Sequence, residues 1–77
     1  MTHSTLTVKA DMAATVYQIL VSPGDEVGPG VVLVVLESMK MEIPVETEFA
    51  CVVTAVHVTD GAIVGEGAAL VTLARRQ

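Results

Sequence analysis

The sequence predicts an all-β domain: a flattened barrel or sandwich of two antiparallel four-stranded sheets related by a pseudo-twofold axis. It is rich in valine and lacks an extended helical stripe of apolar residues, which favours strands. Its second half also repeats its first. With 77 residues, the chain is expected to form a single domain over residues 1–77, with an ordered core at about 5–74.

The internal repeat is the more specific of these observations. Ala14–Leu36 aligns with Cys51–Leu73 without a gap, at a constant offset of 37 residues. The alignment superposes three glycines and seven aliphatic positions, including Val16 on Val53 and Leu33 on Leu70. Such agreement indicates that one β unit has been duplicated, which predicts a twofold-symmetric fold.

Each unit is predicted to contain four strands. The expected ranges are Thr5–Ala10, Thr15–Val21, Glu26–Gly28 and Val31–Glu37, then Glu42–Thr47, Val52–Val58, Ile63–Gly65 and Ala68–Ala74. The "SPGD" and "TDGA" segments have the residues of tight turns. The residues expected to face inward are Val16, Ile19, Val21, Val27, Leu33, Val35 and their second-copy counterparts. The step of three from Val16 to Ile19 predicts a bulge or sharp twist, and Pro44 an edge or bulge position.

Composition excludes several classes of function. The net charge of −5, with four basic residues, argues against a nucleic-acid partner. We expect no membrane association, because no apolar run approaches the roughly 18 residues needed to span a bilayer. The polar start of the chain and the lone Cys51 favour a cytoplasmic location.

The remaining reactive side chains suggest no further chemistry. Cys51 aligns with Ala14 and is interpreted as a small, partly buried filler. His57 is expected to point into solvent and His3 to lie on a ragged terminus, so we predict no metal site. Arg75 and Arg76 are interpreted as a frayed tail.

The connection Met39-Lys40 breaks a rule that the chain otherwise obeys. Two-residue hairpin turns usually carry Asn-Gly or Asp-Gly, because both central residues need positive φ. Met-Lys costs about 1–3 kcal/mol there, and such a local violation marks a candidate functional site. By the 37-residue offset, the counterparts of Lys40 are residues 3 and 77, so this turn is expected at one end and both termini at the other.

Lys40 has the character of an acceptor. The sequence around it has no catalytic set of acids, no glycine-rich phosphate cradle and no cluster of metal ligands. A lysine in water is mostly protonated at pH 7, so another enzyme must deprotonate and acylate it. The resulting arm could swing between distant active sites at high local concentration.

The segment Glu37-Ser38-Met39-Lys40-Met41 resembles Glu-Ala-Met-Lys-Met, the biotin attachment motif of biotinyl domains. The "PGDEVGPGVVL" frame is similar to the flanks of that motif in the biotinyl/lipoyl family. The resemblance spans about Thr5 to Ala74. The chain closely resembles biotin carboxyl carrier domains and short stand-alone biotinylated proteins of the acyl-CoA carboxylase type. Ser38 replaces the usual alanine, and Ala14 and Cys51 stand where the family often has glycine.

The resemblance implies a non-catalytic carrier, monomeric in isolation, with biotin as its cofactor. Biotin would be joined by an amide to Lys40, with Met39 and Met41 as flanking contacts and Glu37 as part of the motif. The implied partners are biotin protein ligase, a biotin carboxylase that loads carboxylate, and a carboxyltransferase that unloads it.

Two alternatives remain open at this stage. The first is a lipoyl carrier for acyl or aminomethyl transfer. Lipoyl domains resemble Glu-(Thr/Ser)-Asp-Lys-Ala, which matches Ser38, whereas Met39 and Met41 favour biotin. The second is an unmodified β module that only binds partners.

Overall fold

The computed structural model describes residues 5–75, which form strands and turns. The strands are β1 (Thr5–Lys9), β2 (Ala14–Ile19), β3 (Glu26–Val27), β4 (Val32–Ser38), β5 (Met41–Glu46), β6 (Cys51–Val56), β7 (Ile63–Val64) and β8 (Ala69–Arg75). These bounds lie within one or two residues of the predicted ranges. This part of the chain contains no helix of the length and apolar character needed to cross a bilayer.

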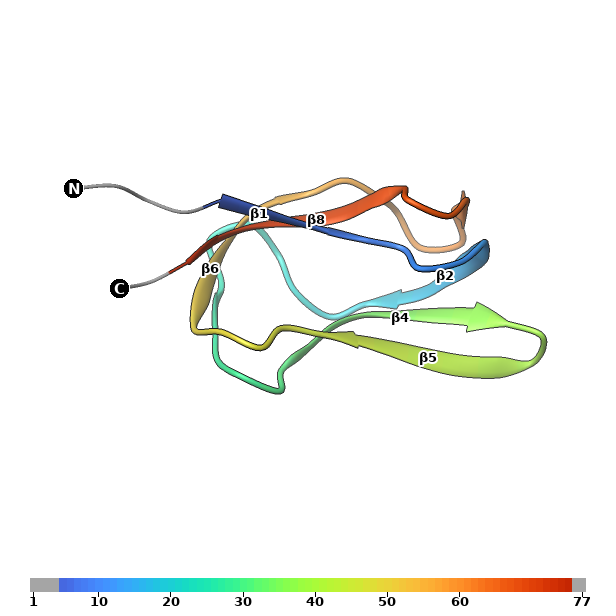
Figure 1. Ribbon diagram of the computed structural model, residues 1–77, viewed down its shortest axis with the longest axis horizontal. Coiled ribbons are helices and arrows are strands. Elements are labelled where there is room, and N and C mark those ends of the chain that lie inside the picture. Colours follow the sequence, from blue (N-terminus) through green and yellow to red (C-terminus); the bar gives the residue numbers. More distant parts are fainter. Residues whose placement is uncertain (1–4, 76–77) are drawn as a thin grey trace.

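The strands form two antiparallel sheets of four (Figure 1). One sheet has the order β1-β8-β6-β3 and is called the terminal sheet, because it holds the first and last strands. The other has the order β5-β4-β2-β7 and is called the hairpin sheet. Position by position, the strands of one sheet are the 37-residue counterparts of the strands of the other, which confirms the predicted fold and pseudo-twofold symmetry. Each sheet takes two strands from each half, so neither half has a complete sheet alone.

The hydrophobic core lies between the sheets and consists of aliphatic side chains and one thiol, and the polar Thr47 is buried as well. Its largest fully buried side chains are Leu33, Leu36, Leu70, Leu73, Val16, Val34, Val53, Val71 and Cys51. All eight aliphatic members form pairs under the 37-residue offset. Cys51 is buried as a free thiol, as expected for a small filler at the position of Ala14.

The predicted bulge is present in β2, and β6 has a bulge at the equivalent position. The pairing of β2 with β4 shifts register between Val16 and Gln18, and the pairing of β6 with β8 shifts between Val53 and Ala55. The extra residue in β2 is Tyr17, which is exposed. The bulge allows Val16 and Ile19 to face the same core although they are three residues apart.

Val35 and its counterpart Thr72 do not face inward, so that part of the prediction is wrong. Val34 and Val71 are fully buried instead, and Leu33 and Leu70 beside them are buried as well. In β4 the cause is a register shift between Val32 and Val34 in the pairing with β5. Such a bulge lets two consecutive residues contact the core, after which the alternation places Val35 on the outer face.

The glycine turns connect the sheets through backbone hydrogen bonds. Gly24 (φ 97°) donates its N–H to the Val53 carbonyl at 2.7 Å, and Gly61 (φ 84°) donates to that of Val16 at 2.8 Å. The Asp25 carboxylate accepts a hydrogen bond from the Ser22 N–H at 2.8 Å. Each turn follows a strand of one sheet and is hydrogen-bonded to a central strand of the other sheet, β6 for Gly24 and β2 for Gly61. These contacts confirm the turns predicted at "SPGD" and "TDGA".

The prediction that Arg75 belongs to a frayed tail is also wrong. Arg75 belongs to β8, and its guanidinium lies 4.1 Å from the centroid of the Phe49 ring. This cation–π contact explains why Arg75 is not a frayed tail. Arg76 and His3 lie outside the described residues. Pro44 is on β5, an edge strand, where a missing N–H costs no ladder hydrogen bond, as predicted.

Candidate functional site

Met39 and Lys40 form the two-residue turn between β4 and β5. The two strands pair up to Ser38 and Met41, so nothing intervenes between the ladder and the turn. The described part of the chain extends 42 Å along its longest axis and only 19 and 17 Å along the others. The turn lies at one end of the long axis, and the start of β1 and the end of β8 lie at the other (Figure 1). Residues 3 and 77 themselves lie outside the described part.

Both turn residues have positive φ, 53° for Met39 and 65° for Lys40. Within residues 5–75 they are the only non-glycine residues in this region of conformational space, and the other positive-φ positions are glycines. The turn therefore has the backbone that a two-residue hairpin requires, without the residues that adopt it readily. The cost of about 1–3 kcal/mol is consistent with side chains retained here for a role other than folding.

The side chains of the turn extend into water. Met39 is 91% exposed and Met41 65% exposed, and Lys40 is exposed between them. Within the described residues, the Lys40 ammonium makes no ion pair or hydrogen bond. The hairpin thus holds a primary amine between two exposed thioethers, which are adaptable contact groups for a partner.

Glu37 lies beside the turn and is directly paired with Glu42 across the β4–β5 ladder. Both are exposed, and because their neighbours Leu36 and Ile43 contact the core, the two carboxylates project from the outer face of the hairpin sheet. Like charges directly opposite one another destabilise a sheet. This acidic pair is therefore a second feature that folding alone does not favour.

A substitution at the turn tests the strain argument. Met39→Gly is expected to raise the free energy of unfolding by about 0.5–1 kcal/mol, because glycine adopts positive φ without a Cβ clash. Urea denaturation followed by circular dichroism measures the change. Gly61→Ala, at a turn where glycine already supplies positive φ, is the matched control and is expected to destabilise. A loss of stability in Met39→Gly would contradict the argument.

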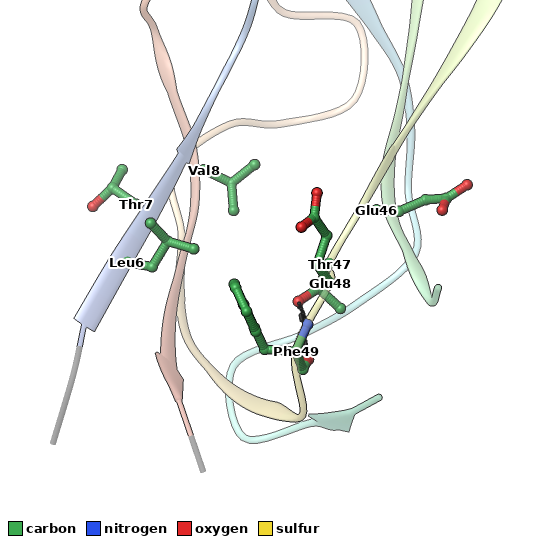
Figure 2. Close-up of a pocket in the computed structure, with 7 residues that line it drawn as sticks. All are labelled: Leu6, Thr7, Val8, Glu46, Thr47, Glu48 and Phe49. Atoms are coloured by element: carbon green, nitrogen blue, oxygen red, sulfur yellow. Dashed lines mark hydrogen bonds between the residues drawn. The ribbon is translucent and has the colours of Figure 1, made fainter. Parts of the chain in front are cut away.

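Two hollows on the described part of the surface lie away from the lysine. One of about 260 Å³ is lined by Leu6, Thr7, Val8, Glu46, Thr47, Glu48 and Phe49. Figure 2 shows Leu6, Val8 and Phe49 gathered between β1 and the chain that follows β5. Glu46 is at the far end of β5 from Met41, about 16 Å along the strand. Lys40 lines neither this hollow nor the one of about 320 Å³ between β1 and β5.

The described residues around the hairpin do not meet the requirements of a metal site. In the part of the chain that the structure describes, no three His, Cys, Asp or Glu side chains come together as a metal-binding group. His57 is exposed, as predicted, and its Nε2 lies 2.6 Å from the Thr72 hydroxyl oxygen. What the hairpin can do is present one amine for covalent modification by another protein.

The family model described as "Biotin-requiring enzyme" matches residues 6–73 of this chain. The chain belongs to this biotin/lipoyl attachment family. The geometry fits a covalently attached cofactor of that kind: among residues 5–75 the amine is accessible and unpaired, and it lines none of the hollows described above. A group attached there would remain free to move, as a carrier requires.

Curated relatives agree with this assignment. The chain is 48% identical over 60 residues to the "Biotinylated protein TB7.3 homolog" of Mycobacterium leprae, covering 78% of this chain and 84% of that one. It is 40% identical over 68 residues to the "Biotin carboxyl carrier protein" of Streptococcus mutans, covering 88% of this chain but 52% of that protein. It is 37% identical to the "Biotin/lipoyl attachment protein" of Bacillus subtilis, covering 88% and 93%. The chain is thus a biotin carboxyl carrier-type domain, and the relatives' names support a carrier rather than an enzyme.

Solved structures with the same fold are parts of much larger enzymes. A single-chain, multi-domain long-chain acyl-CoA carboxylase matches with a TM-score of 0.88 and 33% identity, over 94% of this chain and 7% of that one. The urea carboxylase of Kluyveromyces lactis matches with a TM-score of 0.84 and 18% identity, over 95% of this chain and 6% of that one. The second likeness shows the fold alone, and it confirms the barrel-sandwich architecture.

The structure brings the predicted residues Glu37, Met39, Lys40 and Met41 together on one hairpin, as four exposed side chains at or next to the turn. Our sequence reasoning did not single out Tyr17 or Leu20, which are 52% and 46% exposed. The repeat does contain a sign of these two residues: the larger, apolar side chains Tyr17 and Leu20 align with the polar residues Thr54 and His57 of the second half.

Proposed function

We propose that Lys40 carries biotin as an amide on its Nζ, and that the domain moves a carboxyl group between the active sites of a carboxylase. The observation that carries the proposal is the exposed, unpaired lysine on a strained turn at the end of the long axis. The family match over residues 6–73 and the printed names of the relatives support biotin as the attached group. When bound, biotin would supply an acceptor for carboxylate that can be loaded in one site and unloaded in another.

The attachment reaction requires a separate ligase. The Lys40 ammonium loses a proton, and the free amine attacks the carboxyl carbon of biotin, which the ligase supplies in activated form. The leaving group departs from that carbon and a second proton leaves the nitrogen, so one amide bond forms. Within the described part of the chain no side chain acts as a base toward Nζ, so deprotonation is assigned to the ligase.

The chain's own contribution is presentation. The hairpin holds Nζ away from the rest of the domain, so that a ligase and two carboxylase sites can each reach it. Met39 and Met41 are proposed as the apolar contacts that these enzymes share, because both are exposed and conformationally adaptable. Glu37 is proposed as a charged contact beside them.

The mass of the intact protein purified from its native host tests the proposal. One biotinyl group is expected per chain, located on Lys40 by peptide sequencing and retained by streptavidin. The mass of a lipoyl group at Lys40 would instead establish the lipoyl alternative. An unmodified chain that purified biotin protein ligase also fails to label would support the interaction-module alternative.

A further inference from the structure

The pseudo-twofold symmetry provides an internal comparison between the outer faces of the two sheets. Four outer positions of the hairpin sheet and their counterparts in the terminal sheet differ consistently in polarity. The pairs, hairpin sheet first, are Tyr17 and Thr54, Leu20 and His57, Val35 and Thr72, and Pro44 and Thr7. We call Tyr17, Leu20, Val35 and Pro44 the outer apolar patch. Three neighbouring positions have the opposite polarity: Gln18, Thr15 and Glu37 of the hairpin sheet have the counterparts Ala55, Val52 and Ala74.

The polar residues of the terminal sheet form a connected network. Thr72 Oγ1 lies 2.6 Å from His57 Nε2 and 3.5 Å from Thr7 Oγ1. The Thr54 hydroxyl donates a hydrogen bond to the Thr72 carbonyl at 3.1 Å. This outer face is therefore suited to water, since its polar groups are also satisfied among themselves.

The hairpin sheet exposes apolar surface at the same backbone positions. Tyr17 is 52% exposed and Leu20 46% exposed, and Pro44 is also exposed. Val35 lies between β2 and β5, paired with Gln18 on one side and Pro44 on the other. At the edge of the same sheet, Ile63 is 86% exposed, where its counterpart in the terminal sheet is Glu26.

The fold itself does not require this apolar surface. The same strand geometry in the terminal sheet accepts threonine and histidine, so the backbone at these positions tolerates polar side chains. An exposed apolar face of this kind marks a surface that a partner covers. Its location on β2, β4 and β5 places it on the sheet that carries Lys40.

The charges around the patch indicate the chemistry of the partner. Glu37 and Glu42 project from the same outer face, between the patch and the turn, and repel one another across the ladder. A basic group on a partner would relieve that repulsion. The complementary surface is therefore apolar at its centre and basic where it approaches the modified lysine.

We propose that the outer apolar patch and the Glu37–Glu42 pair are the surface by which this domain docks on the carboxylase component that loads the group on Lys40. The inference rests on the proposed function, which supplies the reason for a partner to approach this end of the molecule. Docking through the hairpin sheet would orient the turn toward the partner's active site. The terminal sheet would stay in solvent.

The test exchanges residues between the two faces. In the variant Tyr17→Thr/Leu20→His, the hairpin sheet receives the residues that the terminal sheet already carries at those positions. In the matched control Thr54→Tyr/His57→Leu, the terminal sheet receives the apolar pair. The unmodified full chains are titrated against the purified biotin carboxylase subunits of the host, and thermal denaturation checks their folding. Ligase labelling, followed by intact mass, is measured in parallel.

We expect the hairpin-sheet variant to bind the carboxylase subunit about tenfold more weakly, as for loss of two anchoring side chains, and the control to bind as the natural chain does. The double variant Glu37→Gln/Glu42→Gln, which preserves the patch, should slow association and flatten the salt dependence of binding. The proposal would be overturned if Tyr17→Thr/Leu20→His and Glu37→Gln/Glu42→Gln both bound the carboxylase subunit as the natural chain does. So would a loss seen only in ligase labelling, or a change from dimer to monomer on gel filtration. Failure of the natural chain to accept biotin would instead overturn the proposed function, and the binding titration is independent of that result.

Discussion

Replacing Lys40 with arginine is expected to abolish biotin attachment completely. Arginine preserves the positive charge and most of the length of the side chain, but its guanidinium is not deprotonated near neutral pH and does not act as the nucleophile. The hairpin should be undisturbed, because Lys40 makes no hydrogen bond or ion pair within the described residues. Intact mass after co-expression with biotin protein ligase measures the result, with a streptavidin blot as a second detection.

Lys9→Arg is the matched control, because Lys9 is the only other lysine of the chain. It is exposed on β1, in the terminal sheet, and its substitution should leave labelling complete. Biotin on the Lys40→Arg protein, or loss of labelling in Lys9→Arg, would show that the wrong amine had been identified. Unfolding of Lys40→Arg, checked by circular dichroism, would contradict the conclusion that Lys40 has no part in stability.

Truncation of Leu33 to alanine is expected to cost about 2–5 kcal/mol of unfolding free energy. Leu33 is fully buried between the sheets, and its removal leaves a cavity that two interlocked sheets cannot close. A single core of this size supplies roughly 3–5 kcal/mol in total, so much of the variant should be unfolded at room temperature. Urea denaturation followed by circular dichroism measures the loss.

The internal symmetry provides a second buried leucine with which the effect of Leu33→Ala can be compared. Leu70 is the counterpart of Leu33 and is also fully buried, so Leu70→Ala should be destabilised by a similar amount. Leu6→Ala, at a position 46% exposed, should change stability by less than about 0.5 kcal/mol. A loss below 1 kcal/mol in both buried variants would mean that the core is not shared between the two halves as the sheets indicate.

Much of this architecture could be predicted because the second half of the sequence repeats the strand and turn pattern of the first half. The 37-residue offset identified the strands that are equivalent in the two halves, and the aliphatic alternation located the core at Val16, Leu33 and their counterparts. The candidate lysine was also predictable, since Met39-Lys40 occupies a turn whose required φ values disfavour both residues. Val35 and Thr72 were misplaced because a bulge changes which residues face inward, and nothing local to β4 marks where the register shifts.

The sequence by itself determined the β class and the duplication, and it indicated the candidate lysine, because each depends on residue type and spacing along the chain. Only the tertiary structure decided which strands share a sheet, and hence that β2, β4 and β5 form one outer face with Lys40 at its end. That face is assembled from separate segments of the chain, so the repeat shows the contrast in residue type at each position, whereas the strand pairing shows that these positions share one face. The same assembly explains Arg75, whose place in β8 depends on contact with Phe49 rather than on its position near the end of the chain.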